Sequence, residues 1–195
     1  MLFDYMVSLV NLYGLVPIKK VVEIYNLQNE DKVSVKDVER IIENRTFDLK
    51  KCFVEAYENY LVNDFILDEY DVDEEINERK GIPFYVPNKT QLMKYRDDLY
   101  SEQPKEFVDL HRYLTNEFYD GDDIMAYELC EEIQVECEFD FTMEGALSCC
   151  EMLGKRIENR DQLEKVVKLI QNLNNNTRKW ENNGFTPNEL GNRRF

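Results

Sequence analysis

Apolar residues recur at helical spacing along the first part of the chain, and turn-forming residues separate the apolar stripes. The first stripe ends at Gly14, and Pro17 stands at the first helical position of the second stripe. Ser34 precedes the third stripe and Asp37 follows three residues later, which is a variant of the capping box. The pattern predicts three helices, over residues 2–13, 18–27 and 35–44.

Two short runs rich in β-branched and aromatic residues come next, over residues 52–57 and 60–66, and a turn-compatible Glu-Asn pair separates them. Three helices followed by a hairpin is the order of elements in a winged helix-turn-helix. Residues 68–88 carry dense carboxylates, but they lack the central glycine and the closing glutamate of a calcium-binding EF-hand loop. We therefore expect a winged-helix-like unit with a solvated acidic connector over residues 1–80.

Helix-capping residues divide the second half of the chain as well. They predict further helices over residues 88–100, 104–118, 122–137 and 142–153, and a long one that starts at residue 159. The expected fold class is therefore mainly α: a winged-helix-like unit of three helices plus a β-hairpin, followed by an acidic helical bundle over residues 81–195.

The C-terminal region contains a second capping box, formed by Thr186 and Glu189 with Pro187 at the first helical position. Gly184 is expected to end the preceding helix. Trp180 would then pack into a sharp corner between two helices.

Charge is distributed unevenly, and the net charge of -16 comes almost entirely from the middle of the sequence. Residues 1–51 balance, residues 52–150 carry 26 acidic against seven basic side chains, and residues 151–195 are slightly basic. No lysine or arginine occurs between Arg112 and Lys155. That interval holds twelve carboxylates: Glu117, Asp120, Asp122, Asp123, Glu128, Glu131, Glu132, Glu136, Glu138, Asp140, Glu144 and Glu151. Such a surface repels nucleic acid and attracts a basic partner.

The five cysteines show no metal-ligand spacing, although Cys130, Cys137, Cys149 and Cys150 cluster in the sequence. We interpret them as buried thiols in a reducing compartment, and we expect no cofactor and no bound metal. The sequence begins without a signal-peptide pattern and has no long apolar stretch, so we expect a cytoplasmic protein without a membrane partner.

Enzyme chemistry finds little support in the sequence. The single histidine, His111, is flanked by Leu110 and Tyr113 and suits the edge of a core better than a catalytic base. No phosphate-binding glycine-rich loop and no hydrolase motif is present. If paired acids held Mg²⁺, the first place to look would be Asp120, Asp122 and Asp123. An enzyme without a readable motif stays open as an alternative.

The C-terminal run of residues 175–190 reads NNTRKWENNGFTPNEL. It resembles the N-N-T-R-x-W-x-N-x-G-x-T-P-x-E-L signature of uncharacterised proteins from Firmicutes and their phages, many of which continue into a zinc-binding SEC-C motif. Residues 12–17 and 24–26, and residues 85–89 and 95–100, are also similar to that family. The signature positions here are Asn176, Thr177, Arg178, Trp180, Gly184, Thr186, Pro187 and Glu189. The chain departs from the family pattern in having no cysteine-rich tail after Leu190.

We interpret the signature as mainly structural. Asn174, Asn175 and Asn176 with Arg178 could instead bind a polar ligand. The resemblance implies an origin in Gram-positive bacteria or their mobile elements, and it implies no reaction.

The function expected from these patterns is that of a non-enzymatic acidic interaction or inhibitor protein. It would bind a basic, nucleic-acid-binding partner, as a nucleic-acid mimic against a bacterial nuclease such as a CRISPR effector. The expected contact residues are Glu117, Asp120, Asp122, Asp123, Glu128, Glu131, Glu132, Glu136 and Glu138. No binding of duplex DNA is expected.

The alternative is a winged-helix regulator that binds nucleic acid. Local positive charge for it is weak, at Lys19-Lys20, at Lys50-Lys51 and in residues 155–194. The expected recognition helix, residues 35–44, carries Lys36 and Arg40 against three acids, so its charges nearly cancel.

Overall fold

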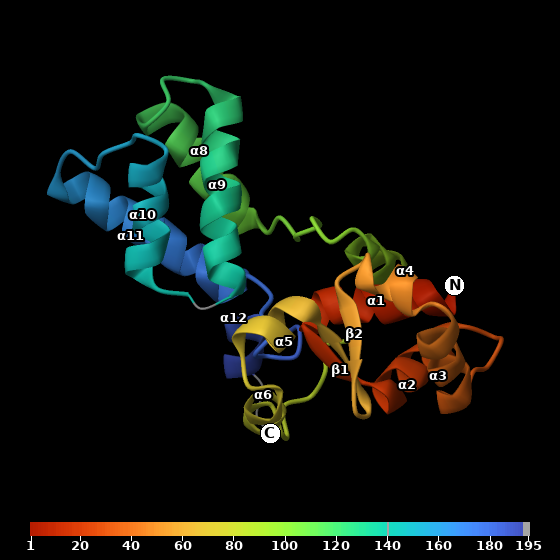
Figure 1. Cartoon of the computed structure of the whole chain (residues 1–195). Helices are drawn as coiled ribbons and strands as arrows, with labels where there is room; N and C mark the ends of the chain where they lie inside the picture. The colour runs from red at the N-terminus through yellow and green to blue at the C-terminus, as the bar shows by residue number, and fades with distance from the viewer. Residues whose placement is uncertain (140, 193–195) are drawn as a thin grey trace. The chain divides into compact units, whose positions relative to one another are not determined.

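The computed structural model describes residues 1–139 and 141–192. These residues are mainly helical and include one three-stranded antiparallel sheet, so the expected fold class is confirmed (Figure 1). They divide into two compact units. The first comprises residues 1–101 and 180–184, and the second comprises residues 102–179 and 185–195 as far as they are described.

The first unit has the winged-helix order of elements. Its helices and strands are α1 (Leu2–Tyr13), β1 (Leu15–Pro17), α2 (Ile18–Gln28), α3 (Val35–Asn44), α4 (Thr46–Lys50), β2 (Val54–Tyr57) and β3 (Tyr60–Asn63). The strand order is β1-β3-β2, with Ala56 opposite Leu61 in the hairpin and Leu15 opposite Val62 at the other edge. The predicted hairpin is therefore confirmed over residues 54–63, and β1 joins it as a third strand. Residues 64–66, expected at the end of the second strand, are helical instead.

Local sequence explains where these helices begin and end. Gly14 adopts φ 71°, a left-handed conformation that glycine reaches at little cost, and its amide bonds to the Val10 carbonyl at 2.7 Å. At α3, the Ser34 side chain and the Asp37 carboxylate form the reciprocal capping box that the sequence predicts. Asn63 ends β3 and caps the next helix by accepting from the Phe65 amide at 3.0 Å.

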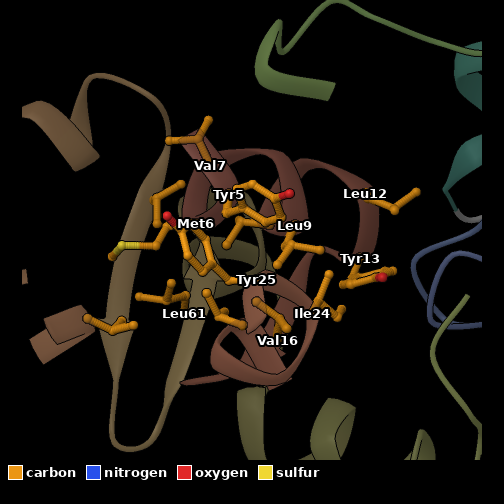
Figure 2. Close-up of a cluster of buried hydrophobic side chains, with 14 of the residues drawn as sticks. Tyr5, Met6, Val7, Leu9, Leu12, Tyr13, Val16, Ile24, Tyr25 and Leu61 are labelled. Atoms are coloured by element: carbon orange, nitrogen blue, oxygen red, sulfur yellow. The ribbon is translucent and has the colours of Figure 1, made fainter. Parts of the chain in front are cut away.

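The core of this unit is built around α1, most of whose side chains are buried. Figure 2 shows α1 residues facing Tyr25 of α2 and Leu61 of β3. The rings of Tyr5 and Tyr25 meet edge to face, with centroids 4.9 Å apart. Helices α1 and α2 and strand β3 thus share one apolar core.

The first unit extends to Ser101, past the predicted boundary at residue 80. The segment contains α5 (Asp64–Glu69), α6 (Val72–Glu78), α7 (Lys89–Leu92) and the 3-10 turn η1 (Met93–Arg96). Helix α6 and the last two residues of α5 therefore lie in the region expected to be a connector, 68–88, and a single helix over 88–100 is not formed. Leu92 and Tyr95 are buried in the α1 core, and Asn11 donates to the Tyr95 carbonyl at 2.8 Å, so tertiary contacts hold this segment on the unit.

The second unit is a helical bundle. Its helices are α8 (Lys105–Glu117), α9 (Asp123–Glu138), α10 (Met143–Met152), α11 (Arg160–Asn176) and α12 (Pro187–Gly191). The predicted caps are present: Asp122, Thr142 and Asn159 each accept from a backbone amide in the first turn of the following helix. Apolar side chains of α8, α9, α10 and α11 form one core.

The expected corner at the C-terminus is wrong in one respect. The helix before Gly184 ends at Asn176, so Gly184 does not terminate it. Thr177 leaves the helix with extended backbone angles, and residues 180–184 form a separate turn that belongs to the first unit. Thr186 and Glu189 do form the predicted capping box at α12. Among the described helices, none is both long and apolar enough to cross a membrane.

Candidate functional site

Helix α9 carries the acidic segment on its solvent side. Glu128, Glu131 and Glu132 are exposed, whereas Leu129, Cys130 and Ile133 of the same helix are buried in the bundle core. Asp122 caps the start of the helix, and its carboxylate accepts from the Met125 amide at 3.2 Å. The three glutamates therefore lie on a rigid element whose opposite face is anchored.

Two exposed aliphatic side chains lie on the same face of α9. Ile124 is 73% exposed and Val135 is 49% exposed. Together with Glu128 and Glu131 they follow the spacing i, i+4, i+7 and i+11, which places all four on one stripe of a helix. We call Ile124, Glu128, Glu131, Glu132 and Val135 the α9 face. The sequence analysis did not predict Ile124 and Val135 as part of this face. Their positions lie off the stripe formed by the buried residues of α9, which is a signal that the sequence contains.

The glutamates of the α9 face have no ion-pair partner in the part of the chain that the structure describes. Within residues 1–139 and 141–192, no lysine or arginine forms an ion pair with Glu128, Glu131 or Glu132. At the start of α9, by contrast, Asp123 lies 3.3 Å from Nε2 of His111. Burial, with the Glu131 carboxylate nearby, raises the pKa of Tyr127. The field of this face is therefore negative.

The remaining predicted contact residues have mixed roles. Glu117 is exposed at the end of α8, and Asp120 lies in the turn before α9 with φ 49°. Glu136 is only half exposed and lies against the start of α10, where a Cβ on Gly145 would come within 2.6 Å of its Oε2 atom. Glu138 is also half exposed. Asp140 lies outside the described residues.

In the second unit, the signature residues form polar contacts with one another. The Arg178 guanidinium bonds to Glu102 at 2.9 Å and to Glu189 at 3.0 Å, and Glu189 also accepts from the Thr186 amide at 3.1 Å. Thr177 donates to the Leu173 carbonyl at 2.9 Å. These groups brace the start of α12.

The asparagines of the signature contribute to the same bracing. The Asn188 side chain donates to Asn176 Oδ1 at 3.1 Å, Asn176 donates to the Asn172 carbonyl at 2.9 Å, and Asn174 is buried. Bonds within the chain thus engage Asn176 and Arg178, whereas Asn174 Oδ1 is buried without a hydrogen-bond partner among the described residues. The ligand-binding alternative for Asn174, Asn175, Asn176 and Arg178 stays a prediction.

Trp180 does not pack into the corner that the sequence predicts. It packs in the first unit, where its indole Nε1 donates to the Asn11 carbonyl at 2.9 Å and its ring covers Gly14. Gly184 adopts φ 81° and lies against the Tyr13 ring, where a Cβ would come within 2.9 Å. The physical reason is that a left-handed glycine leaves room for an aromatic ring that no other residue would leave.

The four clustered cysteines are buried inside the bundle. Burial raises the pKa of Cys137 to about 12 and that of Cys150 to about 11, so these thiols stay protonated and unreactive at neutral pH. Across residues 1–139 and 141–192, no three His, Cys, Asp or Glu side chains are grouped so that they could hold a metal ion.

Comparison with known proteins adds no further constraint: no protein-family model, no curated protein and no solved structure matches this chain. The resemblance of residues 175–190 to the Firmicutes and phage family therefore stays a prediction.

Proposed function

We propose that the chain is a non-enzymatic acidic interaction protein whose α9 face occupies the basic nucleic-acid-binding surface of a partner protein. In this role it would act as a nucleic-acid mimic and inhibitor, with a bacterial nuclease such as a CRISPR effector as one partner of fitting chemistry. The observation that carries the proposal is the row of exposed glutamates on α9 without a cationic partner in the described chain.

The spacing of the glutamates suits a partner groove that carries several cations. A unit charge pair at about 4 Å contributes about 1 kcal/mol in water and more where solvent is excluded. Glu128 and Glu132 are one helical turn apart, so their carboxylates repeat about every 6 Å along α9. A groove lined with lysine and arginine would gain from several such pairs at once. Attraction over this range steers association and weakens with salt, because the Debye length is only about 8 Å at 0.15 M ionic strength.

The first unit favours one alternative, a winged-helix regulator, because its strand order β1-β3-β2 and its element order are those of a winged helix. The exposed charges of α3 oppose DNA reading, since Arg40 lies 3.5 Å from Asp37 on the same helix. Arg193 and Arg194 lie outside the described residues. We therefore keep nucleic-acid binding by this unit as the second candidate.

A charge-reversal variant with a matched control tests the proposal. Glu128→Lys, Glu131→Lys and Glu132→Lys reverse the α9 face, whereas the control reverses three other exposed acids that form no ion pair among the described residues: Asp68, Glu69 and Glu74. Both triple variants change the net charge equally. Each surface substitution should alter stability by about 0.5 kcal/mol or less.

The probe is a labelled 20-residue lysine-rich peptide, free or bound to single-stranded DNA. The wild type should bind the peptide and release the DNA at low ionic strength, and the α9 variant should bind at least about 10-fold more weakly than the control. An equal loss in both variants would reduce the effect to net charge and remove the α9 face as the site. A shift of a duplex DNA probe by the wild type at submicromolar concentration would favour the regulator instead.

A further inference from the structure

A cleft of about 1090 Å³ opens in the second unit between α10, the loop that follows it and the start of α11. One wall is a single face of α10, because Glu144, Leu147, Ser148 and Glu151 follow the spacing i, i+3, i+4 and i+7. The loop residues Gly154 to Ile157 line the cleft where α10 ends, and Leu163 of α11 completes the lining. The cleft therefore runs along about two turns of a helix.

Its apolar lining is aliphatic and partly open to solvent. Leu147 and Ile157 are half-buried and pack on the bundle core, while Leu163 is 38% exposed on the first turns of α11. A volume of about 1090 Å³ lies just above the range of about 300–1,000 Å³ for small-molecule pockets. An open groove with three aliphatic side chains suits the apolar stripe of a helix better than a compact ligand.

Charge is ordered along the cleft. Glu144 and Glu151 lie on the α10 wall and are seven residues apart, about 10.5 Å along the helix axis. A helix that runs beside α10 presents its own i and i+7 side chains at the same spacing, so two basic residues could meet both carboxylates. Lys155 and Arg156 lie at the loop end, where the partial negative charge of a docked helix C-terminus would be favoured.

The loop end is held in place by the chain itself. The Lys155 amide donates to the Cys150 carbonyl at 2.8 Å, and Gly154 adopts φ 73° to close the α10 C-terminus. The Lys155 ammonium lies over the Tyr119 ring at 4.1 Å from its centroid. The cationic end of the cleft is therefore preformed rather than created by a ligand.

We infer that this cleft binds an amphipathic basic helix of the partner protein. The aliphatic side chains of that helix would contact Leu147, Ile157 and Leu163, and its basic side chains would pair with Glu144 and Glu151. The inference rests on the proposed function, since it supplies the structural element by which a basic partner is recognised. The α9 face then attracts the partner by charge, and the cleft selects it by shape.

Two synthetic peptides of identical composition test the inference. One is an 18-residue helix of leucine and lysine with its leucines on one stripe, and the other is a scrambled version without a stripe. The wild type should bind the amphipathic peptide about 10-fold more tightly than the scrambled one, which is about the effect of burying one aliphatic side chain. Leu163→Ser should reduce that ratio below about 3-fold, and Glu144→Gln with Glu151→Gln should weaken the amphipathic peptide selectively.

The control is Leu99→Ser, which removes an 88% exposed leucine from the first unit and should leave the ratio unchanged. Peptide-induced protection from hydrogen exchange should fall on α10 and residues 154–163. A ratio that survives Leu163→Ser, or protection elsewhere, overturns the inference. So does self-association of the free protein that Leu163→Ser abolishes, because the cleft would then hold a second copy.

Failure of the proposed function gives a different result. If reversing Glu128, Glu131 and Glu132 leaves the affinity for both peptides unchanged, the α9 face is not the electrostatic site, whatever the cleft does. If that variant weakens the binding of both peptides equally while Leu163→Ser has no effect, the result supports the α9 face as the electrostatic site and refutes the cleft as a binding site.

Discussion

Replacing Gly14 with alanine should destabilise the first unit more than a left-handed glycine replacement normally does. An alanine at φ 71° pays about 1–2 kcal/mol for the left-handed conformation. Its Cβ would also lie 2.6 Å from two ring atoms of Trp180 and 2.7 Å from Cδ1 of Ile66, and overpacking of this kind costs about 1–3 kcal/mol. We expect a total loss of about 2–5 kcal/mol.

Gly81 supplies the matched control, because it adopts φ 93° with no atom within 4 Å of the added Cβ. Gly81→Ala should therefore pay only the backbone cost of about 1–2 kcal/mol. The chain has a single tryptophan, Trp180, and it lies in the first unit, so its fluorescence during urea unfolding reports on that unit. Each kcal/mol should also lower Tm by about 4–8 °C for a unit of this size.

A second-site change completes the test. Combining Gly14→Ala with Trp180→Leu should cost less than the sum of the two single changes, because the smaller side chain relieves the contact that the new Cβ makes. Circular dichroism replaces fluorescence for this variant. Equal destabilisation by Gly14→Ala and Gly81→Ala, or simple additivity in the double variant, would refute the assignment of Trp180 to the Gly14 surface.

Three further predictions concern buried polar groups. Arg79→Met should destabilise the first unit by about 3–5 kcal/mol, because the buried guanidinium pairs with a carboxylate of α6 and donates to an α1 carbonyl at 2.8 Å. The control Lys80→Met, at an exposed side chain, should change the free energy of unfolding in urea by about 0.5 kcal/mol or less. Equal losses in the two variants would contradict the prediction. Burial raises the thiol pKa from 9.0 to about 12 at Cys137 and about 11 at Cys150, so the unfolded chain releases these protons first. The contribution of these thiols to the free energy of unfolding of the second unit should be fully present below about pH 9 and should be lost as the pH rises toward 11–12. Equal urea midpoints at pH 8 and pH 10.5 would contradict the prediction. At pH 8, a thiol reagent should modify the partly exposed Cys52 in the native protein and leave the buried thiols intact until urea is added.

Local sequence was sufficient for the features that depend on neighbouring residues. The capping boxes at Ser34 and Thr186 occur where they are predicted, because a side chain and an amide three residues away are enough to form them. The helices of the bundle begin one residue after their predicted caps for the same reason. The hairpin follows from two β-prone runs and the turn between them.

Features that depend on distant partners were not readable in this way. β1 is three residues long and includes Pro17, and only its pairing with β3 makes it a strand. Trp180 lies against Gly14 across 166 positions of sequence, although a corner within its own segment was the local expectation. Periodicity alone also did not separate Glu136, which lies against α10, from Glu128, which faces solvent.

The sequence determined some features of the proposed interaction surface, and the tertiary structure decided the others. Composition and spacing determined that the middle of the chain is acidic and helical, because charge is a property of the residues themselves. The tertiary structure decided which carboxylates meet solvent without an ion-pair partner among the described residues, and it brought Leu147 and Leu163 to the lining of one cleft. That second step needs the packing of α9, α10 and α11 on a shared core, since burial is decided by contacts between segments and not within them.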